Sequence, residues 1–238
     1  EVILGLIPVI INIAEQSTND AIAAAQAAEA NGADGLMLLP PMSYKSTDDE
    51  TVDYFASIAQ STKLPIMIYN NPVDYKIEVT LDMFGQLQKY KNIQAVKEST
   101  QDISNVTRMI NRFGNRYQIL CGVDTLAMES LVMGAHGWIA GLVDAFPRET
   151  VAVFAYTKAG KIEEALSIYR WFLPLLELDI TPQLVQNIKQ CEVATGIGTG
   201  YVRKPRIELK GEERIRVQKI IDQSLATRPD LGNYKTYL

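Results

Sequence analysis

The chain has 238 residues, which is long enough to bury a full single-domain core. Hydrophobic residues make up 47% of the chain and charged residues 21%, proportions that are typical of a soluble globular protein. The net charge of −5 and the isoelectric point near 5.1 argue against nucleic acid or an anionic membrane as a partner.

Six strand–helix units follow one another along residues 1–159. Each predicted strand is a short apolar run, and each is followed by a stretch with helical periodicity. The predicted strands are Pro8–Ile13, Gly35–Leu39, Pro65–Tyr69, Ile93–Lys97, Gln118–Cys121 and Gly137–Ala140. The predicted helices are Ala21–Ala30, capped by Thr18 or Asn19, then Asp48–Ser61, Leu81–Tyr90, Ile103–Phe113, Thr125–Met133 and Arg148–Ala159.

This alternation predicts an α/β fold with a parallel sheet and right-handed crossovers. Two architectures fit it, a doubly wound open sheet and a (β/α)8 barrel. No glycine-rich phosphate loop follows the first strand, which weakens the dinucleotide-binding version of the open sheet. From residue 160 to residue 238 the pattern predicts a C-terminal helical segment, with helices near Lys161–Leu178, Pro182–Thr195 and Gly211–Ala226.

Nothing in the sequence predicts a membrane span or a signal peptide. The apolar start, Val2 to Ile13, lacks a basic region and is interrupted by Gly5 and Pro8. Cys121 and Cys191 lie far apart in sequence, as is typical of buried thiols in a reducing compartment. We therefore expect a cytoplasmic protein.

The strand Ile93–Lys97 ends in a lysine, an unusual residue for a strand that is buried on both faces. A lysine in an apolar pocket loses solvation of its charged form, so its pKa falls and its amine becomes a nucleophile. The alternative is a lysine that points into solvent at the strand end. The strand by itself does not decide between the two.

Active sites of parallel α/β proteins lie at the carboxyl ends of the strands. Tyr69 and Lys97 end successive predicted strands, and a phenol beside an amine can move protons while the amine attacks a carbonyl or imine carbon. We therefore predict this pair as catalytic. The other side chains and glycines near strand ends are Asn12, Glu15, Ser43, Tyr44, Lys45, Asn70, Asn71, Ser99, Gly122, Asp124, Gly141 and Asp144.

Other notable residues favour structural roles. His136 is the single histidine, which leaves a histidine-based metal site or serine triad without support. Gly196–Gly200 resembles a phosphate loop but follows a helix, which favours a helix C-cap. Glu98 alternates with Lys97 and is expected to point to the opposite side, toward the helices. Glu15 and Asp74 fit a site and a loop surface equally well.

Two motifs, Tyr69–Pro72 and Val96–Ser99, resemble the dihydrodipicolinate synthase/N-acetylneuraminate lyase family of Schiff-base (β/α)8 enzymes. The lysine of the second motif follows the tyrosine of the first by 28 residues. The resemblance extends from about Pro8 to near Leu225 and implies a TIM barrel, of which this chain shows six units. Supporting motifs are Gly32–Gly35, Gly122–Asp124 and Gly134–Gly137.

The resemblance implies that Lys97 forms a covalent Schiff base with the substrate while Tyr69 relays protons, with no metal or organic cofactor. It implies a small-molecule imino or oxo acid as substrate, and a homo-oligomer, either tetramer or dimer. The implied substrate-binding residues are Asn71, Ser99, Gly122, Asp124 and Gly141.

Three departures from the family pattern matter. Asp74 stands where the synthase branch has an arginine that grips a carboxylate, which argues against dihydrodipicolinate synthesis. Met42-Ser43, with Tyr44 one place later, replaces a tyrosine pair. The family also has two further βα units before Pro8, and six parallel strands cannot close the usual barrel, so we expect a fragment or a shortened form.

Within the family, several motifs are most similar to the 1-pyrroline-4-hydroxy-2-carboxylate deaminases of hydroxyproline breakdown. In this hypothesis Lys97 attacks the imine carbon and opens the ring, after which loss of water and ammonia gives 2-oxoglutarate semialdehyde. The alternatives are an aldolase or lyase of a small 2-oxo acid, and an inactive fragment or interaction module. The motifs are Leu39–Met42, Tyr69–Val73, Ala145–Thr150 and Val202–Arg206.

Overall fold

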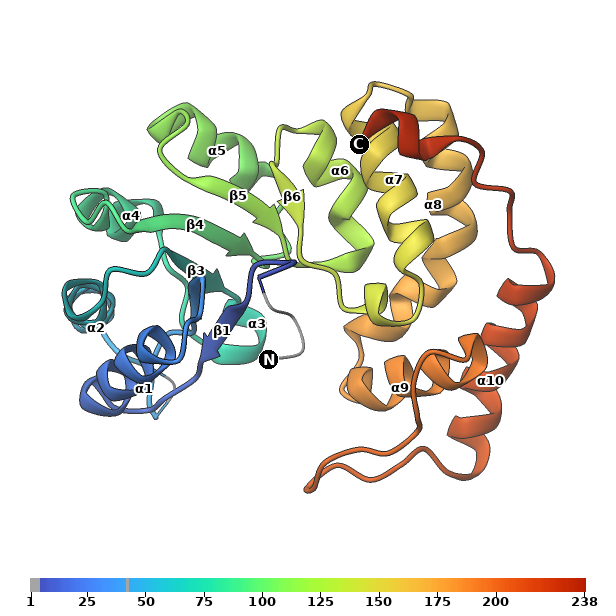
Figure 1. Ribbon diagram of the computed structural model, residues 1–238, viewed down its shortest axis with the longest axis horizontal. Coiled ribbons are helices and arrows are strands. Elements are labelled where there is room, and N and C mark those ends of the chain that lie inside the picture. Colours follow the sequence, from blue (N-terminus) through green and yellow to red (C-terminus); the bar gives the residue numbers. More distant parts are fainter. Residues whose placement is uncertain (1–4, 42) are drawn as a thin grey trace. The chain divides into compact units, whose positions relative to one another are not determined.

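The computed structural model, described for residues 5–41 and 43–238, contains a six-stranded α/β sheet whose strands follow chain order (Figure 1). The first four strands pair in parallel with their neighbours. The predictions that involve Val2 and Met42 lie outside the described residues. The strands are β1 (Ile10–Ile13), β2 (Gly35–Leu38), β3 (Ile66–Asn70), β4 (Ile93–Glu98), β5 (Gln118–Cys121) and β6 (Gly137–Trp138).

Each predicted helix is present; Asp48–Ser61 and Gly211–Ala226 have the predicted ends, and the others differ by a few residues. Ser17 rather than Thr18 or Asn19 caps the first helix, because its hydroxyl accepts the Asp20 N–H. The helices are α1 (Thr18–Ala30), α2 (Asp48–Ser61), α3 (Pro72–Tyr75), α4 (Leu81–Leu87), α5 (Ser104–Phe113), α6 (Ala127–Val132), α7 (Pro147–Lys158), α8 (Ile162–Leu176), α9 (Leu184–Thr195) and α10 (Gly211–Ala226). Short 3-10 turns span Asp124–Leu126, Leu142–Asp144, Glu177–Ile180 and Tyr234–Tyr237.

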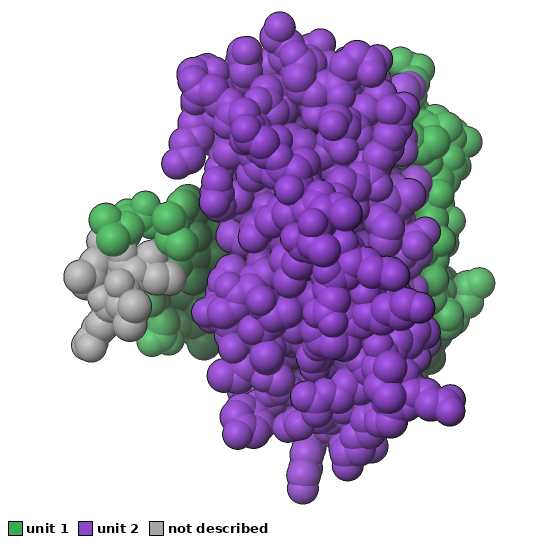
Figure 2. Space-filling model, turned by 90° about the vertical axis from the view of Figure 1, so that its right-hand side faces the viewer, with its two compact units in different colours: residues 1–120, 134–136 green, residues 121–133, 137–238 purple. Residues whose placement is uncertain are grey.

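The chain divides into two compact units, residues 1–120 with 134–136 and residues 121–133 with 137–238 (Figure 2). The second unit holds the helices from α6 onward, and its core includes the aromatic cluster Phe146, Trp171 and Phe172. Trp171 therefore packs against the core of this unit. In the described part of the chain, no helix combines the length and apolar character that a membrane crossing requires.

In the first unit, helices α1, α2, α4 and α5 cover one face of the strands (Figure 1). Leu38, Ile68 and Val96 on that face are fully buried, whereas their strand neighbours Met37, Met67 and Lys97 on the opposite face are only partly buried. This alternation follows from the two-residue period of a strand. The face of β2, β3 and β4 away from the helices is therefore the more accessible of the two.

A β-bulge sets which face each residue of β4 occupies. Ile66 pairs with Ile93, but Met67 pairs with Ala95, so β4 contains one extra residue at this point. Beyond the bulge, Val96 and Glu98 face the helices and Lys97 faces the other side. The face on which each residue at the end of β4 lies therefore depends on this bulge.

The apolar run of the first predicted strand suggests a buried strand, but most of β1 is exposed. Ile10 is 47% exposed and Ile11 is 38% exposed, and only Ile13 is buried. Within residues 5–41 and 43–238, β1 pairs with β2 alone, which leaves its other edge uncovered. A hollow of about 860 Å³ lies along this edge, between β1 and α1.

Candidate active site

Tyr69 on β3 and Lys97 on β4 lie directly opposite each other at the carboxyl ends of the two strands. The Lys97 Nζ atom lies 4.1 Å from the centroid of the Tyr69 ring, a cation–π contact. Both side chains are partly buried, on the face of the sheet that the helices do not cover. The structure therefore brings together the two residues predicted as catalytic.

The loop after β3 adds Asn71 to this pair. Asn71 caps the short helix α3, where its Oδ1 accepts the Asp74 N–H at 3.2 Å. Its Nδ2 donates to the Tyr69 hydroxyl at 3.2 Å and to Asp74 Oδ2 at 2.7 Å. Asn71 therefore connects the phenol oxygen of Tyr69 to the carboxylate of Asp74, an exposed residue.

Tyr75, at the end of α3, was not identified by the sequence analysis. Its ring packs edge-on against Tyr69 with centroids 5.4 Å apart. Burial, with further contributions from Tyr69 and Asp74, raises the pKa of Tyr75 to about 12. The signal for this residue was weak, because α3 has only four residues and an apolar period cannot be recognised over so short a run.

Ser99 follows β4, two residues after Lys97. It is 3% exposed, and its backbone N–H donates to the Asn70 carbonyl at 2.8 Å. Among residues 5–41 and 43–238, its hydroxyl has no hydrogen-bond partner. A buried hydroxyl without a partner costs free energy that a bound polar ligand can recover.

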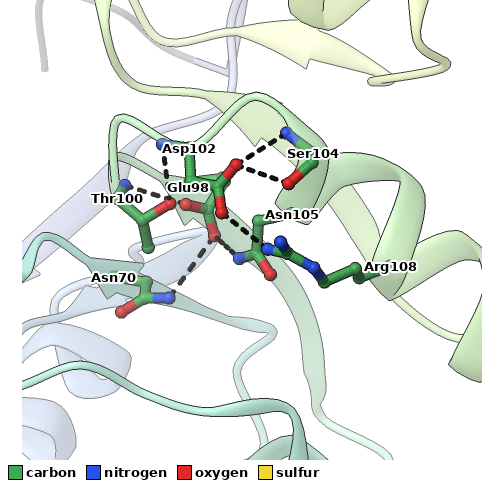
Figure 3. A network of polar contacts seen from close by, with 7 residues as sticks. All are labelled: Asn70, Glu98, Thr100, Asp102, Ser104, Asn105 and Arg108. Carbon is green, nitrogen blue, oxygen red and sulfur yellow. Dashed lines mark hydrogen bonds and ion pairs between the residues drawn. The ribbon is translucent and has the colours of Figure 1, made fainter.

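On the opposite face of the same strands, Asn70 and Glu98 are buried and hydrogen-bonded (Figure 3). Glu98 points toward the helices, as expected from its alternation with Lys97. Burial raises the pKa of Glu98, whereas hydrogen bonds from Thr100, Asn105 and Asn70 act in the opposite direction. No sequence pattern marks Asn105 as a partner of Glu98.

The predicted substrate-binding residues Gly122, Asp124 and Gly141 belong to the second compact unit. Asp124 is fully buried, and its Oδ1 accepts from Trp138 Nε1 at 2.9 Å and from Gly141 N–H at 3.1 Å. Its Oδ2 accepts from Leu142 N–H at 2.9 Å. The Asp124 carboxylate therefore shapes the turn that begins at Gly141.

Two residues assigned structural roles from the sequence have them. His136 Nδ1 accepts the Ile119 N–H at 3.0 Å, and Gly196 caps α9 with a left-handed φ of 75°. Among the described residues, no three His, Cys, Asp or Glu side chains gather in a way that would hold a metal ion. The reactive groups at the ends of β3 and β4 are the amine of Lys97 and the phenol of Tyr69, which lie beside each other.

Comparisons with known proteins identify relatives of this chain. A model of the dihydrodipicolinate synthetase family matches residues 1–224. The 4-hydroxy-tetrahydrodipicolinate synthase of Methanococcus maripaludis is 28% identical over 223 residues, which are 93% of this chain and 76% of that protein. The same enzyme of Geotalea daltonii is 29% identical over 191 residues, which are 80% of this chain and 65% of that protein.

Solved structures give the same result. The dihydrodipicolinate synthase of Aquifex aeolicus matches with a TM-score of 0.88 at 25% identity, covering 93% of this chain and 76% of that one. The 4-hydroxy-tetrahydrodipicolinate synthase of Methylacidiphilum fumariolicum matches with a TM-score of 0.86 at 26% identity, covering 95% of this chain and 77% of that one.

Proposed function

The chain belongs to the dihydrodipicolinate synthetase family, and on this premise we propose that it is a Schiff-base-forming lyase or aldolase of a small 2-oxo acid. The family and the fold class predicted from the sequence are confirmed, since the six-stranded α/β sheet fits part of the barrel of these enzymes. The family relatives favour this alternative over the deaminase that we put first from the sequence.

The observation that carries the proposal is the contact between Lys97 and Tyr69. The Lys97 amine attacks the carbonyl carbon of the 2-oxo acid, and the resulting carbinolamine loses the carbonyl oxygen as water to form an imine. The protonated imine withdraws electrons from the neighbouring carbon, where a carbon–carbon bond can then form or break. Tyr69 supplies and removes the protons that these steps require.

We propose that the remaining predicted residues contribute to substrate binding. Ser99 offers a buried hydroxyl that has no partner among the residues the structure describes, and Asn71 donates to the Tyr69 oxygen. We keep Gly122, Asp124 and Gly141 as proposed residues for the carboxylate side of the substrate, with Asp124 acting through the backbone that it holds. We also propose that the protein is a cytoplasmic homo-oligomer that needs no metal or organic cofactor for this chemistry.

A second candidate is the deaminase of 1-pyrroline-4-hydroxy-2-carboxylate, and one observation favours it. Asp74 replaces the arginine that the sequence resemblance places there in synthases, and it is bound to Asn71 beside Tyr69. A carboxylate at this position disfavours a second carboxylate on the substrate and tolerates an iminium. Asp74→Arg would then abolish turnover of the imino acid while leaving adduct formation with pyruvate.

Borohydride trapping tests the proposed function directly. The full-length protein is incubated with pyruvate or with 1-pyrroline-4-hydroxy-2-carboxylate, reduced and digested, and the peptides are weighed. We expect Lys97 to gain the mass of one pyruvate less one oxygen atom, because an imine is reduced to a secondary amine. An adduct with the imino acid alone, accompanied by release of a semialdehyde, would assign the second candidate instead.

A further inference from the structure

Asn70 and Glu98 form a cross-strand pair on the face of the sheet opposite Tyr69 and Lys97. Each follows the proposed catalytic residue of its strand by one position, and successive side chains of a strand point to opposite faces. Asn70 is fully buried and Glu98 is 6% exposed. The pair therefore lies directly behind the site.

The Glu98 carboxylate connects three segments of the chain (Figure 3). Its Oε2 accepts from Asn105 Nδ2 at 2.9 Å and from Asn70 Nδ2 at 3.4 Å. Its Oε1 accepts from the Thr100 N–H at 2.8 Å. One side chain thus joins the end of β3, the turn after β4 and the first turn of α5.

Asn70 extends the connection to the loop that carries Asn71. Its Oδ1 accepts the Val79 N–H at 2.9 Å, and its Nδ2 donates to the Val79 carbonyl at 3.1 Å. Its own carbonyl accepts the Ser99 N–H at 2.8 Å. Both ends of the loop between Asn70 and Val79 are therefore held together behind Tyr69.

The start of α5 is fixed by bonds of its own (Figure 3). Asp102 Oδ1 accepts from the Ser104 N–H at 3.0 Å and from the Ser104 hydroxyl, and Asp102 Oδ2 pairs with Arg108 at 2.6 Å. The hydrogen bonds from Ser104 and then from Arg108 lower the pKa of Asp102 to about 2. Asn105 is thus presented to Glu98 from a turn that also has hydrogen bonds of its own.

Burying a carboxyl group as deeply as Glu98 makes the free energy of folding less favourable. A buried charge loses hydration, and an apolar side chain of similar volume often serves the fold as well or better. Val96, one position earlier on the same face, is apolar and fully buried. The hydrogen bonds of Glu98 therefore point to a role other than filling the core.

We propose that Glu98 is a positioning residue, whose carboxylate holds the ends of β3 and β4 in the register that sets the Lys97 amine over the Tyr69 ring. This inference rests on the proposed function, because it concerns the geometry of the Schiff-base lysine. Glu98 itself touches no substrate, since it lies on the opposite face of the sheet.

Three variants separate positioning from folding. Glu98→Gln keeps the size of the side chain but forces its NH2 group against either the Thr100 N–H or the two asparagine amides. The double variant Glu98→Gln/Asn105→Asp restores a hydrogen bond between these positions with donor and acceptor exchanged. Glu163→Gln makes the same chemical change at an exposed position of α8 and serves as the control.

In the full-length protein, we would measure the rate of pyruvate trapping on Lys97, the amide hydrogen exchange of Ser99 and the urea midpoint. Misplacement of a reacting group by about 1 Å can cost up to about 100-fold in rate, so Glu98→Gln should slow trapping by about 10- to 100-fold. It should also speed exchange of the Ser99 amide, which is bound to the end of β3. The double variant should recover part of both changes, and Glu163→Gln should alter neither.

Trapping at the wild-type rate in Glu98→Gln would overturn the proposal and leave the proposed function intact. The proposal would also be overturned if the urea midpoint fell in both Glu98 variants and the trapping rate fell in proportion to it. Glu98 would then act through folding alone. If the wild-type protein traps no pyruvate, the proposed function fails. Unchanged Ser99 exchange in Glu98→Gln would then reject the positioning role independently.

Discussion

The two faces of the sheet at the ends of β3 and β4 hold their polar side chains in different ways. On the helix-covered face, Asn70 and Glu98 are buried and bonded to the main chain and to α5. On the other face, Tyr69 and Lys97 are partly buried and contact each other through a ring and an amine. The same two strands thus carry a closed polar network on one side and an accessible pair on the other.

A sheet can therefore position reactive groups without enclosing them. A reactive side chain needs an unoccupied polar atom, so it cannot be fixed by many hydrogen bonds at its tip. Its backbone can be fixed from behind, because consecutive residues of a strand point in opposite directions. In this chain the supporting residue directly follows the supported one in both strands.

The largest effect expected on the accessible face is that of Lys97→Ala. Without the amine no imine can form, so both turnover and the borohydride-trapped adduct should be lost completely. Lys45→Ala is the matched control, since Lys45 is an exposed lysine in the loop after β2 and its loss should leave trapping unchanged. An adduct on Lys45 or any other lysine in the Lys97→Ala protein would show that Lys97 is not the nucleophile.

Tyr69→Phe should have the next largest effect. The ring that packs against Lys97 and Tyr75 remains, but the hydroxyl that would relay protons is removed. Loss of general acid–base catalysis typically costs about 10²- to 10⁴-fold in rate, so turnover should fall by that factor while adducts still form slowly. Tyr44→Phe, at a 59% exposed tyrosine, is the control. Equal turnover in the two variants would remove Tyr69 from the mechanism.

The comparison of the two faces also shows where sequence patterns were sufficient. The strand ends placed Tyr69 and Lys97 at one edge of the sheet and predicted them as a catalytic pair, and the family resemblance added the Schiff-base role of the lysine. Both predictions depend on strand order and on residue type, which a single sequence displays. The structure places these two side chains in contact, although their catalytic roles stay a prediction.

The face occupied by Lys97 could not be derived in the same way. Counting by twos from the buried Ile93 assigns Lys97 to the helix-covered face together with Ala95. The bulge opposite Ile66 and Met67 shifts the phase by one residue, and this shift brings Val96 and Glu98 to the helices instead. No residue type within β4 predicts such a bulge, because the bulge arises from the way in which β4 pairs with β3.

The contacts of Asn105 and the exposure of β1 were missed for a related reason. Both depend on how separate elements pack: α5 brings Asn105 against Glu98, and Ile10 and Ile11 lie on a strand that pairs only with β2 among the described residues. Apolar periodicity describes one element at a time. It therefore predicted the strand β1 and the helix α5 correctly, but it did not predict which elements lie beside them.

Ser99→Ala should have a smaller effect on the accessible face. The hydroxyl has no partner in the described part of the chain, so its removal should leave the urea midpoint unchanged or slightly raised. If the hydroxyl binds substrate, KM should rise by about 5- to 15-fold, the loss expected for one neutral hydrogen bond of about 1 to 1.5 kcal/mol. Thr107→Val is the control, because it removes another buried, unpartnered hydroxyl, on α5. An unchanged KM in Ser99→Ala would exclude Ser99 from substrate binding.

The smallest effect concerns the pH dependence of stability on the helix-covered face. Burial raises the pKa of Glu98 above the ordinary value of 4.5, so the folded state binds this proton more tightly than the unfolded state. The free energy of unfolding should therefore fall as pH rises from 4.5 through the folded pKa, and the loss should be complete above it. Glu98→Gln cannot titrate and should lack this component. Urea unfolding of both proteins across this range measures the difference, in which the contributions of Asp102 and other shared carboxyl groups cancel. A constant difference between the two proteins across the range would mean that Glu98 keeps an ordinary pKa, and that its hydrogen bonds offset the effect of its burial.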